Sequence, residues 1–202
     1  LRSSGININT MPVMDLMHKS SHKIIKNRCY SNKIKTINVL GKICIDTLKS
    51  NKIASVAKHI PGHGIANADS HKKMPIVSEI FKKLNSEDFS TFKNLNSHFV
   101  MTAHVLYKKI DRNYVATQSK KIIKNIIRKR MNFKGLIISD DISMKALKGN
   151  LLVNAKKSLD AGCNLILYCN GNIDESYSIL KGLDRIDRFT SKKTQQLYQF
   201  LR

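Results

Sequence analysis

Three histidines and an aspartate are concentrated in one glycine-containing stretch, KHIPGHGIANADSHKKMP, residues 58–75. The proline and glycines disfavour a helix, so His59 and His63, although four residues apart, are not expected to form the metal-binding pair of a zinc-protease helix. Asp69 and His71 are separated by one small residue. The carboxylate can therefore hydrogen-bond the imidazole, fix its tautomer and raise its basicity. This spacing predicts an acid/base pair.

Two other interpretations of this stretch remain open. In the first, the histidines only hydrogen-bond backbone groups of a loop, which is a common role for a single histidine but a less common one for three together. In the second, a metal is held by nitrogen and oxygen ligands drawn from His59, His63, Asp69, His71 and His104. The spacing matches no standard zinc signature, so no metal or cofactor is expected.

A second group of chemically active residues ends the apolar run GLIISDDISM, residues 135–144. Asp140 and Asp141 follow a buried strand, and two ionised carboxylates cannot both remain in the core. Adjacent side chains near a strand end point in opposite directions, so we expect one to reach a reaction centre and the other to brace nearby loops. A strand-end carboxylate is a natural nucleophile in glycoside chemistry. A helix-capping or ion-pairing role fits Asp141 better than Asp140.

Short apolar runs alternate with amphipathic segments along the chain, which is the pattern of βα units that build a parallel sheet. Strands are expected at residues 6–13, 53–60, 98–105, 135–139 and 164–168. Helices are expected at residues 33–49, 79–83, 86–95, 119–131 and 151–161, with a terminal helix after Gly182. The polar residues that follow the five strands are Asp15, His59 with His63, His104, Asp140 with Asp141, and Asn170. Because the carboxyl ends of parallel strands meet at one edge, we expect one site there.

Composition limits the class of protein. The chain has 202 residues, of which 42% are hydrophobic, so we expect a single folded domain over residues 1–202. No apolar run is long enough to span a membrane, no signal-peptide pattern opens the chain, and the four cysteines form no CxxC pair. We therefore expect a cytoplasmic protein with reduced cysteines and no membrane partner.

The net charge of +22 raises the alternative of a nucleic-acid-binding protein. The lysines are spread over the whole chain, however, and no stacking-aromatic or recognition-helix motif accompanies them. Solvent-facing lysines explain the charge equally well, so no nucleic-acid partner is expected.

The motifs KHIPGHG, DSH and SDDISM together resemble those of the glycoside hydrolase family 3 β-N-acetylhexosaminidases of bacterial cell-wall recycling, the NagZ group. The resemblance extends from GININTMPVMDL through MTAHV to AGCNLILYCN. It implies an α/β fold of the (β/α)8 TIM-barrel type. It also implies a retaining hydrolase that removes terminal β-linked N-acetylglucosamine from peptidoglycan fragments, including those ending in 1,6-anhydro-N-acetylmuramic acid and muropeptides, as a monomer without a cofactor.

The resemblance also assigns residues to roles. It implies that Asp140 is the nucleophile and that His71 with Asp69 forms the acid/base dyad. The substrate-binding residues that it implies are Arg28, Lys58 and His59, and the pocket-lining residues are His63, His104 and Met144.

The chain departs from the family pattern, and the glycine that precedes the substrate-binding arginine in the family is replaced here. The chain also contains no counterpart of the DxEGGxVxR-like stretch, and only five of eight barrel strands are expected. We therefore expect an incomplete barrel and a fragment, a truncated reading frame or one part of a split protein. The alternatives to the hydrolase are a β-N-acetylglucosaminide phosphorylase of the same family, an inactive fragment and a nucleic-acid-binding protein.

Overall fold

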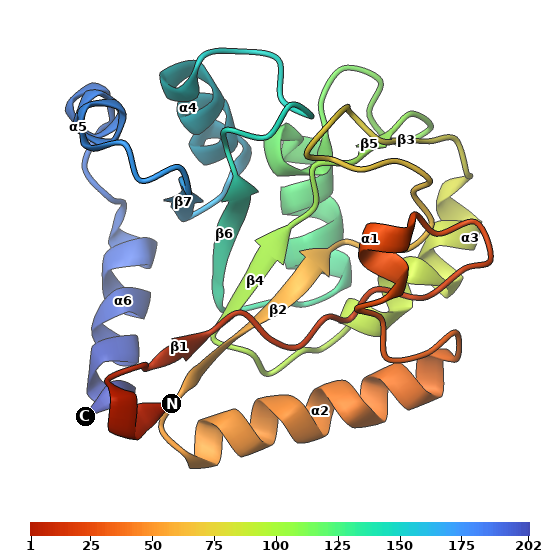
Figure 1. Ribbon diagram of the computed structural model, residues 1–202, viewed down its shortest axis with the longest axis horizontal. Helices are drawn as coiled ribbons and strands as arrows, with labels where there is room; N and C mark the ends of the chain where they lie inside the picture. Colours follow the sequence, from red (N-terminus) through yellow and green to blue (C-terminus); the bar gives the residue numbers. More distant parts are fainter.

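The computed structural model describes all 202 residues and contains a five-stranded parallel sheet (Figure 1). The strand order is β1-β2-β4-β6-β7, which follows the order in the chain. The strands are β1 (Ile8–Asn9), β2 (Ala54–Ile60), β4 (Phe99–Thr102), β6 (Leu136–Asp141) and β7 (Leu165–Leu167). Each of these strands overlaps one of the five predicted ranges. The predicted α/β class and parallel sheet are therefore confirmed.

Helices fill most of the connections between the strands. The α-helices are α1 (Lys23–Lys26), α2 (Ile34–Ser50), α3 (Phe81–Ser86), α4 (Leu151–Ala161), α5 (Ile173–Gly182) and α6 (Arg188–Leu201). A π-helical segment, η4 (Lys121–Arg130), and three short 3-10 turns, η1 (Arg2–Ser4), η2 (Asp88–Phe92) and η3 (Ala116–Gln118), complete the set. The predictions of helices at 33–49, 119–131 and 151–161 and after Gly182 are confirmed.

Two helix predictions need correction. The helix predicted at residues 86–95 is the 3-10 turn η2, because the buried carboxylate of Asp88 hydrogen-bonds His18 and the backbone N–H of Ile65 and so holds the chain in a turn. The helix predicted at 79–83 begins later, at Phe81. Helix α5 was not predicted, because most of its apolar residues, Ile173, Tyr177 and Leu180, are exposed and only Ile179 is buried.

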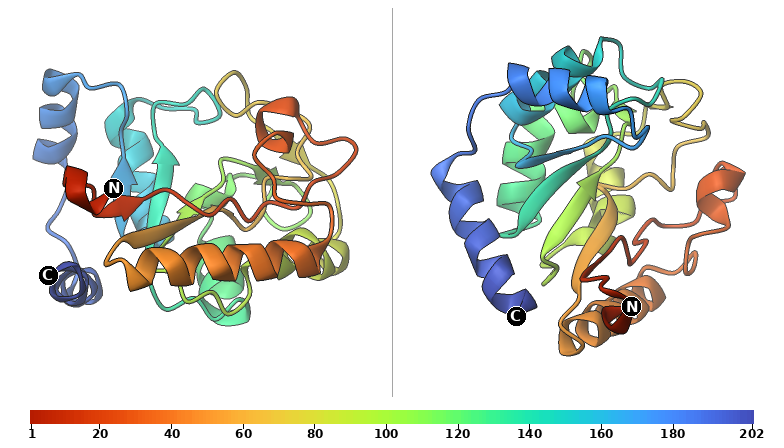
Figure 2. Two further views of the ribbon diagram at one scale, coloured as in Figure 1. Left: turned by 60° about the horizontal axis from the view of Figure 1, so that its bottom comes forward. Right: turned by 60° about the vertical axis from the view of Figure 1, so that its left-hand side comes forward.

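The two faces of the sheet bury different sets of side chains. Ala57, Val100 and Ile137 join a core cluster with residues of α2, η2 and η4. Val56, Met101 and Leu136 point to the opposite face, where they pack with Leu197 of α6. Figure 2 shows α6 standing along this inner side of the curled sheet. The sheet does not close into a barrel, so the structure contains the partial barrel that was expected and not a complete one.

A second, two-stranded parallel sheet lies beyond the carboxyl ends of the main strands. It pairs β3 (Ile76–Val77) with β5 (Leu106–Tyr107), and was not predicted. The backbone N–H of Leu106 also donates to the carbonyl of Pro75 at 2.9 Å. This small sheet fixes the end of the 58–75 stretch beside the chain that leaves β4. No helix in the structure combines the length and the apolar composition that crossing a membrane requires.

Candidate active site

Asp15 connects the first strand segment to the histidine-containing stretch. Its carboxylate is fully buried, accepts a hydrogen bond from His59 Nδ1 at 2.7 Å and accepts another from the backbone N–H of His63 at 2.6 Å. Burial raises the pKa of Asp15, but the charge and hydrogen bond of His59 outweigh burial, so the pKa lies below its ordinary value. Asp15 therefore fixes the orientation of His59, a role that the sequence did not assign.

His63 lies against this pair with no hydrogen-bond partner on either ring nitrogen. Its ring meets that of His59 edge to face, with 5.9 Å between centroids. Burial, followed by the neighbouring His59, lowers the pKa of His63 to about 4. The ring is therefore neutral at physiological pH.

Lys58 and Asp140 lie on the inner face of the sheet on either side of β4. Lys58 is paired in register with Met101, which is paired with Ile138, and Asp140 follows Ile138 by two residues on the same face. Burial and the charge of Arg28 lower the pKa of Lys58, while Asp140 and Asp15 act in the opposite direction. A cationic and an anionic side chain thus share one end of the sheet.

Asp141 and His104 brace the end of β6. Asp141 accepts hydrogen bonds from the backbone N–H and the hydroxyl of Ser143 at 3.0 and 2.7 Å. The buried His104 ring donates through Nε2 to the carbonyl of Asp141 at 3.0 Å, and its Nδ1 contacts Thr117 Oγ1 at 2.7 Å. Because both ring nitrogens of His104 are engaged, its position is that of a support beneath the site and not of a group free to contact a ligand.

Asp69 and His71 form the hydrogen bond that their spacing predicts. Asp69 Oδ1 lies 2.8 Å from His71 Nδ1 and 2.9 Å from the His71 backbone nitrogen. Burial raises the pKa of Asp69, but these two hydrogen bonds outweigh it, so the pKa lies below the ordinary value. The His71 side chain is 55% exposed. Its Nε2 is therefore free to exchange a proton with a ligand.

The loop that carries this pair is tied to the loop that follows Asp140. The backbone N–H of Ala146 donates to the carbonyl of Ser70 at 3.1 Å, and both residues are buried. Met144, two residues before this contact, is also buried. This backbone hydrogen bond links the loop that carries Asp69 and His71 to the loop that follows the strand-end carboxylate.

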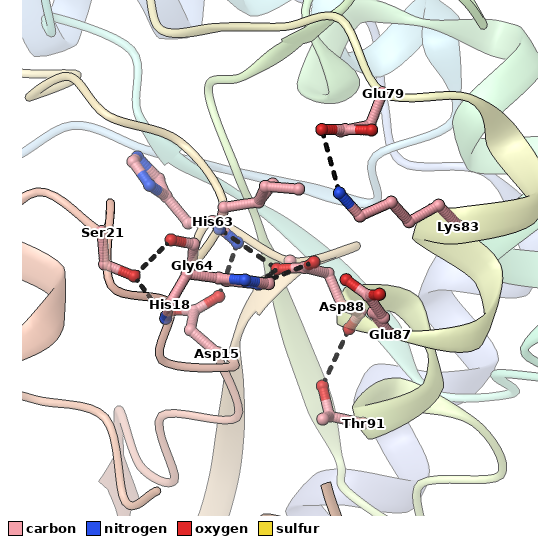
Figure 3. Close-up of polar contacts among 12 residues, drawn as sticks. Asp15, His18, Ser21, His63, Gly64, Glu79, Lys83, Glu87, Asp88 and Thr91 are labelled. Carbon is pink, nitrogen blue, oxygen red and sulfur yellow. Dashed lines mark hydrogen bonds and ion pairs between the residues drawn. The ribbon is translucent and has the colours of Figure 1, made fainter. Parts of the chain in front are cut away.

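A further network supports the start of the 58–75 stretch (Figure 3). His18 Nε2 lies 3.0 Å from Asp88 Oδ2, and Ser21 Oγ donates to the carbonyl of Gly64 at 2.6 Å. A side chain at position 64 would place its Cβ 1.8 Å from the carbonyl oxygen of Leu16, so this close crossing of two chains requires glycine. The sequence analysis missed His18 and Asp88, because they are 70 residues apart and carry no local motif.

The metal alternative does not fit this geometry. The residues considered as ligands, His59, His63, Asp69, His71 and His104, do not form a group of three whose ligand atoms lie within 4.8 Å of one another. Arg28, the remaining predicted site residue, lies exposed after α1 and donates through Nε to the carbonyl of Ile24 at 2.9 Å. The positive charge of Arg28 lowers the pKa of Lys58, so the two residues lie on the same side of the molecule.

A curled parallel sheet with carboxylates, histidines and a lysine gathered at the carboxyl ends of its strands is typical of the α/β barrel class, in which ligands bind at this edge of the sheet. Residues 1–195 match the glycosyl hydrolase family 3 N-terminal domain, and the chain belongs to this family.

Relatives of known name agree with the family. The chain is 36% identical over 175 residues to a β-hexosaminidase of Methylobacillus flagellatus, covering 84% of this chain and 50% of that protein. It is 36% identical over 187 residues to a β-hexosaminidase of Haemophilus influenzae, covering 90% and 51%. The chain therefore spans about half the length of the curated relatives it matches.

Solved structures show the same fold. NagZ from Neisseria gonorrhoeae superposes with a TM-score of 0.86 at 28% identity, covering 100% of this chain and 58% of that one. A family 3 β-N-acetylglucosaminidase from Paenibacillus superposes with a TM-score of 0.89 at 26% identity, covering 99% and 40%.

Proposed function

We propose that this chain carries the catalytic residues of a retaining β-N-acetylhexosaminidase. The observation that carries the proposal is the Asp69–His71 pair, held at 2.8 Å on a loop that contacts, through Ser70 and Ala146, the loop that follows Asp140. A nucleophile and a proton donor are the two groups that a retaining glycosidase needs. The names of the relatives, β-hexosaminidase and β-N-acetylglucosaminidase, support the choice of sugar.

The first step uses Asp140 as the nucleophile. Its carboxylate attacks the anomeric carbon, the bond from that carbon to the leaving oxygen breaks, and His71 Nε2 gives its proton to that oxygen. Asp69 hydrogen-bonds Nδ1 of His71, so Nε2 is the ring nitrogen that faces the substrate. In the second step His71 takes a proton from water, the water oxygen attacks the same carbon, and Asp140 is released. Two inversions restore the β anomer.

The residues around this centre are assigned to sugar binding. Lys58 and Arg28 supply charge beside Asp140, and His59, oriented by Asp15, presents Nε2 to a hydroxyl. The substrate class that we propose is terminal β-linked N-acetylglucosamine on peptidoglycan fragments, processed in the cytoplasm by a monomer without a cofactor.

The test compares two substrates with leaving groups of different quality. 4-Nitrophenol leaves readily without a proton, whereas a sugar hydroxyl needs one, so His71→Ala should lower kcat on N,N′-diacetylchitobiose by about 10²- to 10⁴-fold and on the 4-nitrophenyl glycoside much less. Asp140→Asn should abolish both activities. Asp46→Asn, an exposed substitution on α2, serves as the control. A folded wild-type chain that hydrolyses neither substrate would contradict the proposal.

The same assay addresses the phosphorylase alternative, which the cationic pair of Arg28 and Lys58 beside Asp140 favours. A phosphorylase transfers the sugar to phosphate and releases a sugar phosphate, and its turnover depends on added phosphate. The hydrolase that we propose releases free N-acetylglucosamine at a rate that phosphate leaves unchanged.

A further inference from the structure

His18, Glu87 and Asp88 bring three potential metal ligands together away from the residues assigned to catalysis. One ligand atom of each side chain, an imidazole nitrogen or a carboxylate oxygen, lies within 4.8 Å of those of the other two. The residues come from two segments, the chain that follows β1 and the start of η2, and Figure 3 shows their side chains next to one another. No other three histidine, cysteine, aspartate or glutamate residues in the structure meet this distance.

Asp88 is a rigid ligand, because several contacts fix its position. It is buried, its Oδ1 accepts a hydrogen bond from the backbone N–H of Ile65 at 3.1 Å, and its carbonyl accepts one from Thr91 Oγ1 at 3.0 Å. Gly62 packs so closely against it that a Cβ at position 62 would lie 2.8 Å from the Asp88 Cβ. A carboxylate held in this way loses little further freedom when it binds an ion.

His18 supplies the nitrogen ligand. Its backbone N–H donates to Ser21 Oγ at 2.8 Å, and that hydroxyl donates to the carbonyl of Gly64 at 2.6 Å, so this segment is also anchored. The ring Nε2 lies 3.0 Å from Asp88 Oδ2. Two ligands that are each about 2.0–2.2 Å from one zinc ion can have this separation. The His18 side chain is 20% exposed, so an ion can reach it from solvent.

Glu87 contributes a carboxylate that no ion pair of the protein neutralises. His18 is the cation partner of Asp88, but no lysine, arginine or histidine nitrogen lies within 4.0 Å of the Glu87 carboxylate. Lys83, one turn earlier, pairs instead with Glu79 at 3.1 Å. Two neighbouring carboxylates repel each other, and a divalent cation bound between them balances both charges.

The donor set indicates the class of ion. Calcium and magnesium prefer oxygen ligands alone, whereas an imidazole nitrogen together with carboxylates suits zinc and similar divalent metals. Three protein ligands leave at least one coordination position for water, and the partial exposure of His18 admits that water.

We propose that His18 Nε2 and the carboxylates of Glu87 and Asp88 bind a divalent cation of the zinc class. As the ion binds, Nε2 loses its proton to solvent. The ion ties the chain after β1 to the start of η2 and, through the Ile65 N–H on Asp88, to the 58–75 stretch. Its role is structural, because none of its ligands is assigned to catalysis, and it does not depend on the proposed hydrolase function.

Zinc titration followed by NMR at His18 tests the proposal. In the isotopically labelled chain, Zn²⁺ should shift the nitrogen signal of His18 Nε2, because the metal replaces the proton on that atom. Glu87→Gln retains the His18–Asp88 pair but removes a charged ligand, and should weaken the zinc affinity about tenfold or more. Glu87 is only partly buried, so this variant should fold. Asp46→Asn, an exposed change of equal charge on α2, should leave the affinity within about twofold.

A second variant should change the affinity in the opposite direction. The hydrogen bond to Asp88 raises the pKa of His18, and the positive charge of Lys83 acts against it. The same charge repels a cation at this position, so Lys83→Gln should tighten zinc binding about threefold.

Two results would overturn the proposal. Zinc that shifts the signals of His59 or His71 and leaves His18 unchanged would show that it binds elsewhere. Equal zinc affinity in wild type and Glu87→Gln would show that His18 and Asp88 form an ion pair without a metal.

Discussion

Burial determines the charge of His63, the histidine of the 58–75 stretch whose ring has no hydrogen-bond partner. Its pKa falls from 6.5 to about 4 on folding. The unfolded chain therefore binds this proton below about pH 6.5, whereas the folded chain binds it only near pH 4. The contribution of His63 to stability is fully present above pH 6.5 and is lost as the pH falls toward 4.

This shift predicts a loss of about 3 kcal/mol in the free energy of unfolding between pH 6.5 and pH 4, at about 1.4 kcal/mol per pKa unit. Urea denaturation at a series of pH values measures it. His63→Gln removes the titrating group and should flatten the dependence over this range. An identical slope in wild type and variant would refute this assignment.

Asp15 predicts a different effect at the same scale. Asp15→Ala leaves the His59 ring N–H and the His63 backbone N–H buried without their acceptor, so the free energy of unfolding should fall by about 3 kcal/mol. Asp46→Ala removes an exposed ion pair with Lys42 and should cost less than about 1 kcal/mol. Equal urea unfolding midpoints for the two variants would contradict the role of Asp15 as a buried residue that orients His59.

Side-chain pairing could be predicted only where it is local. Asp69 and His71 are two residues apart, so their hydrogen bond follows from spacing. Asp15 and His59 are separated by 44 residues, and their contact depends on how β1 and β2 pair. The available signal was that both residues follow predicted strands. The unpartnered ring of His63 had no sequence signal, because it depends on what the fold leaves empty.

At the scale of elements, helices with clear ends and a buried face could be predicted and others could not. Helix α4 spans the predicted residues because Asn150 caps its start and Gly162, at φ 118°, ends it. Helix α5 has a similar cap at Asn172, but Ile173, Tyr177 and Leu180 are exposed, so no core-facing stripe marks it. Hydrophobic periodicity therefore identifies a helix that buries one face against the core more readily than a helix whose apolar residues are exposed.

The contact between the two functional loops leads to a prediction about hydrogen exchange. The Ala146 amide donates to Ser70, so its exchange should be slowed relative to that of Lys148, whose amide has no backbone acceptor. Amide exchange followed by NMR compares the two residues in one sample. Exchange of the Ala146 amide as fast as that of Lys148 would show that the loops are not held together in solution.

At the scale of the whole molecule, the alternating pattern predicted the parallel sheet, and the sequential strand order is the one expected of consecutive βα units. The small β3–β5 sheet could not be predicted, because strands of two residues carry too little pattern. The chain holds five parallel strands of a family whose matched curated relatives are about twice as long. Of the residues to which we assign catalysis, Asp140 lies at the carboxyl end of β6, and Asp69 with His71 lie in the connection that follows the carboxyl end of β2.

Covalent trapping tests the central claim, that Asp140 is the nucleophile of a retaining N-acetylglucosaminidase. The chain is treated with the 5-fluoro glycosyl fluoride of N-acetylglucosamine, and its mass is measured before and after proteolysis. The account predicts one added glycosyl unit, located on Asp140 and absent from the Asp140→Asn variant. A folded chain that takes up no label, or that carries it on Asp141 or another residue, would contradict the account.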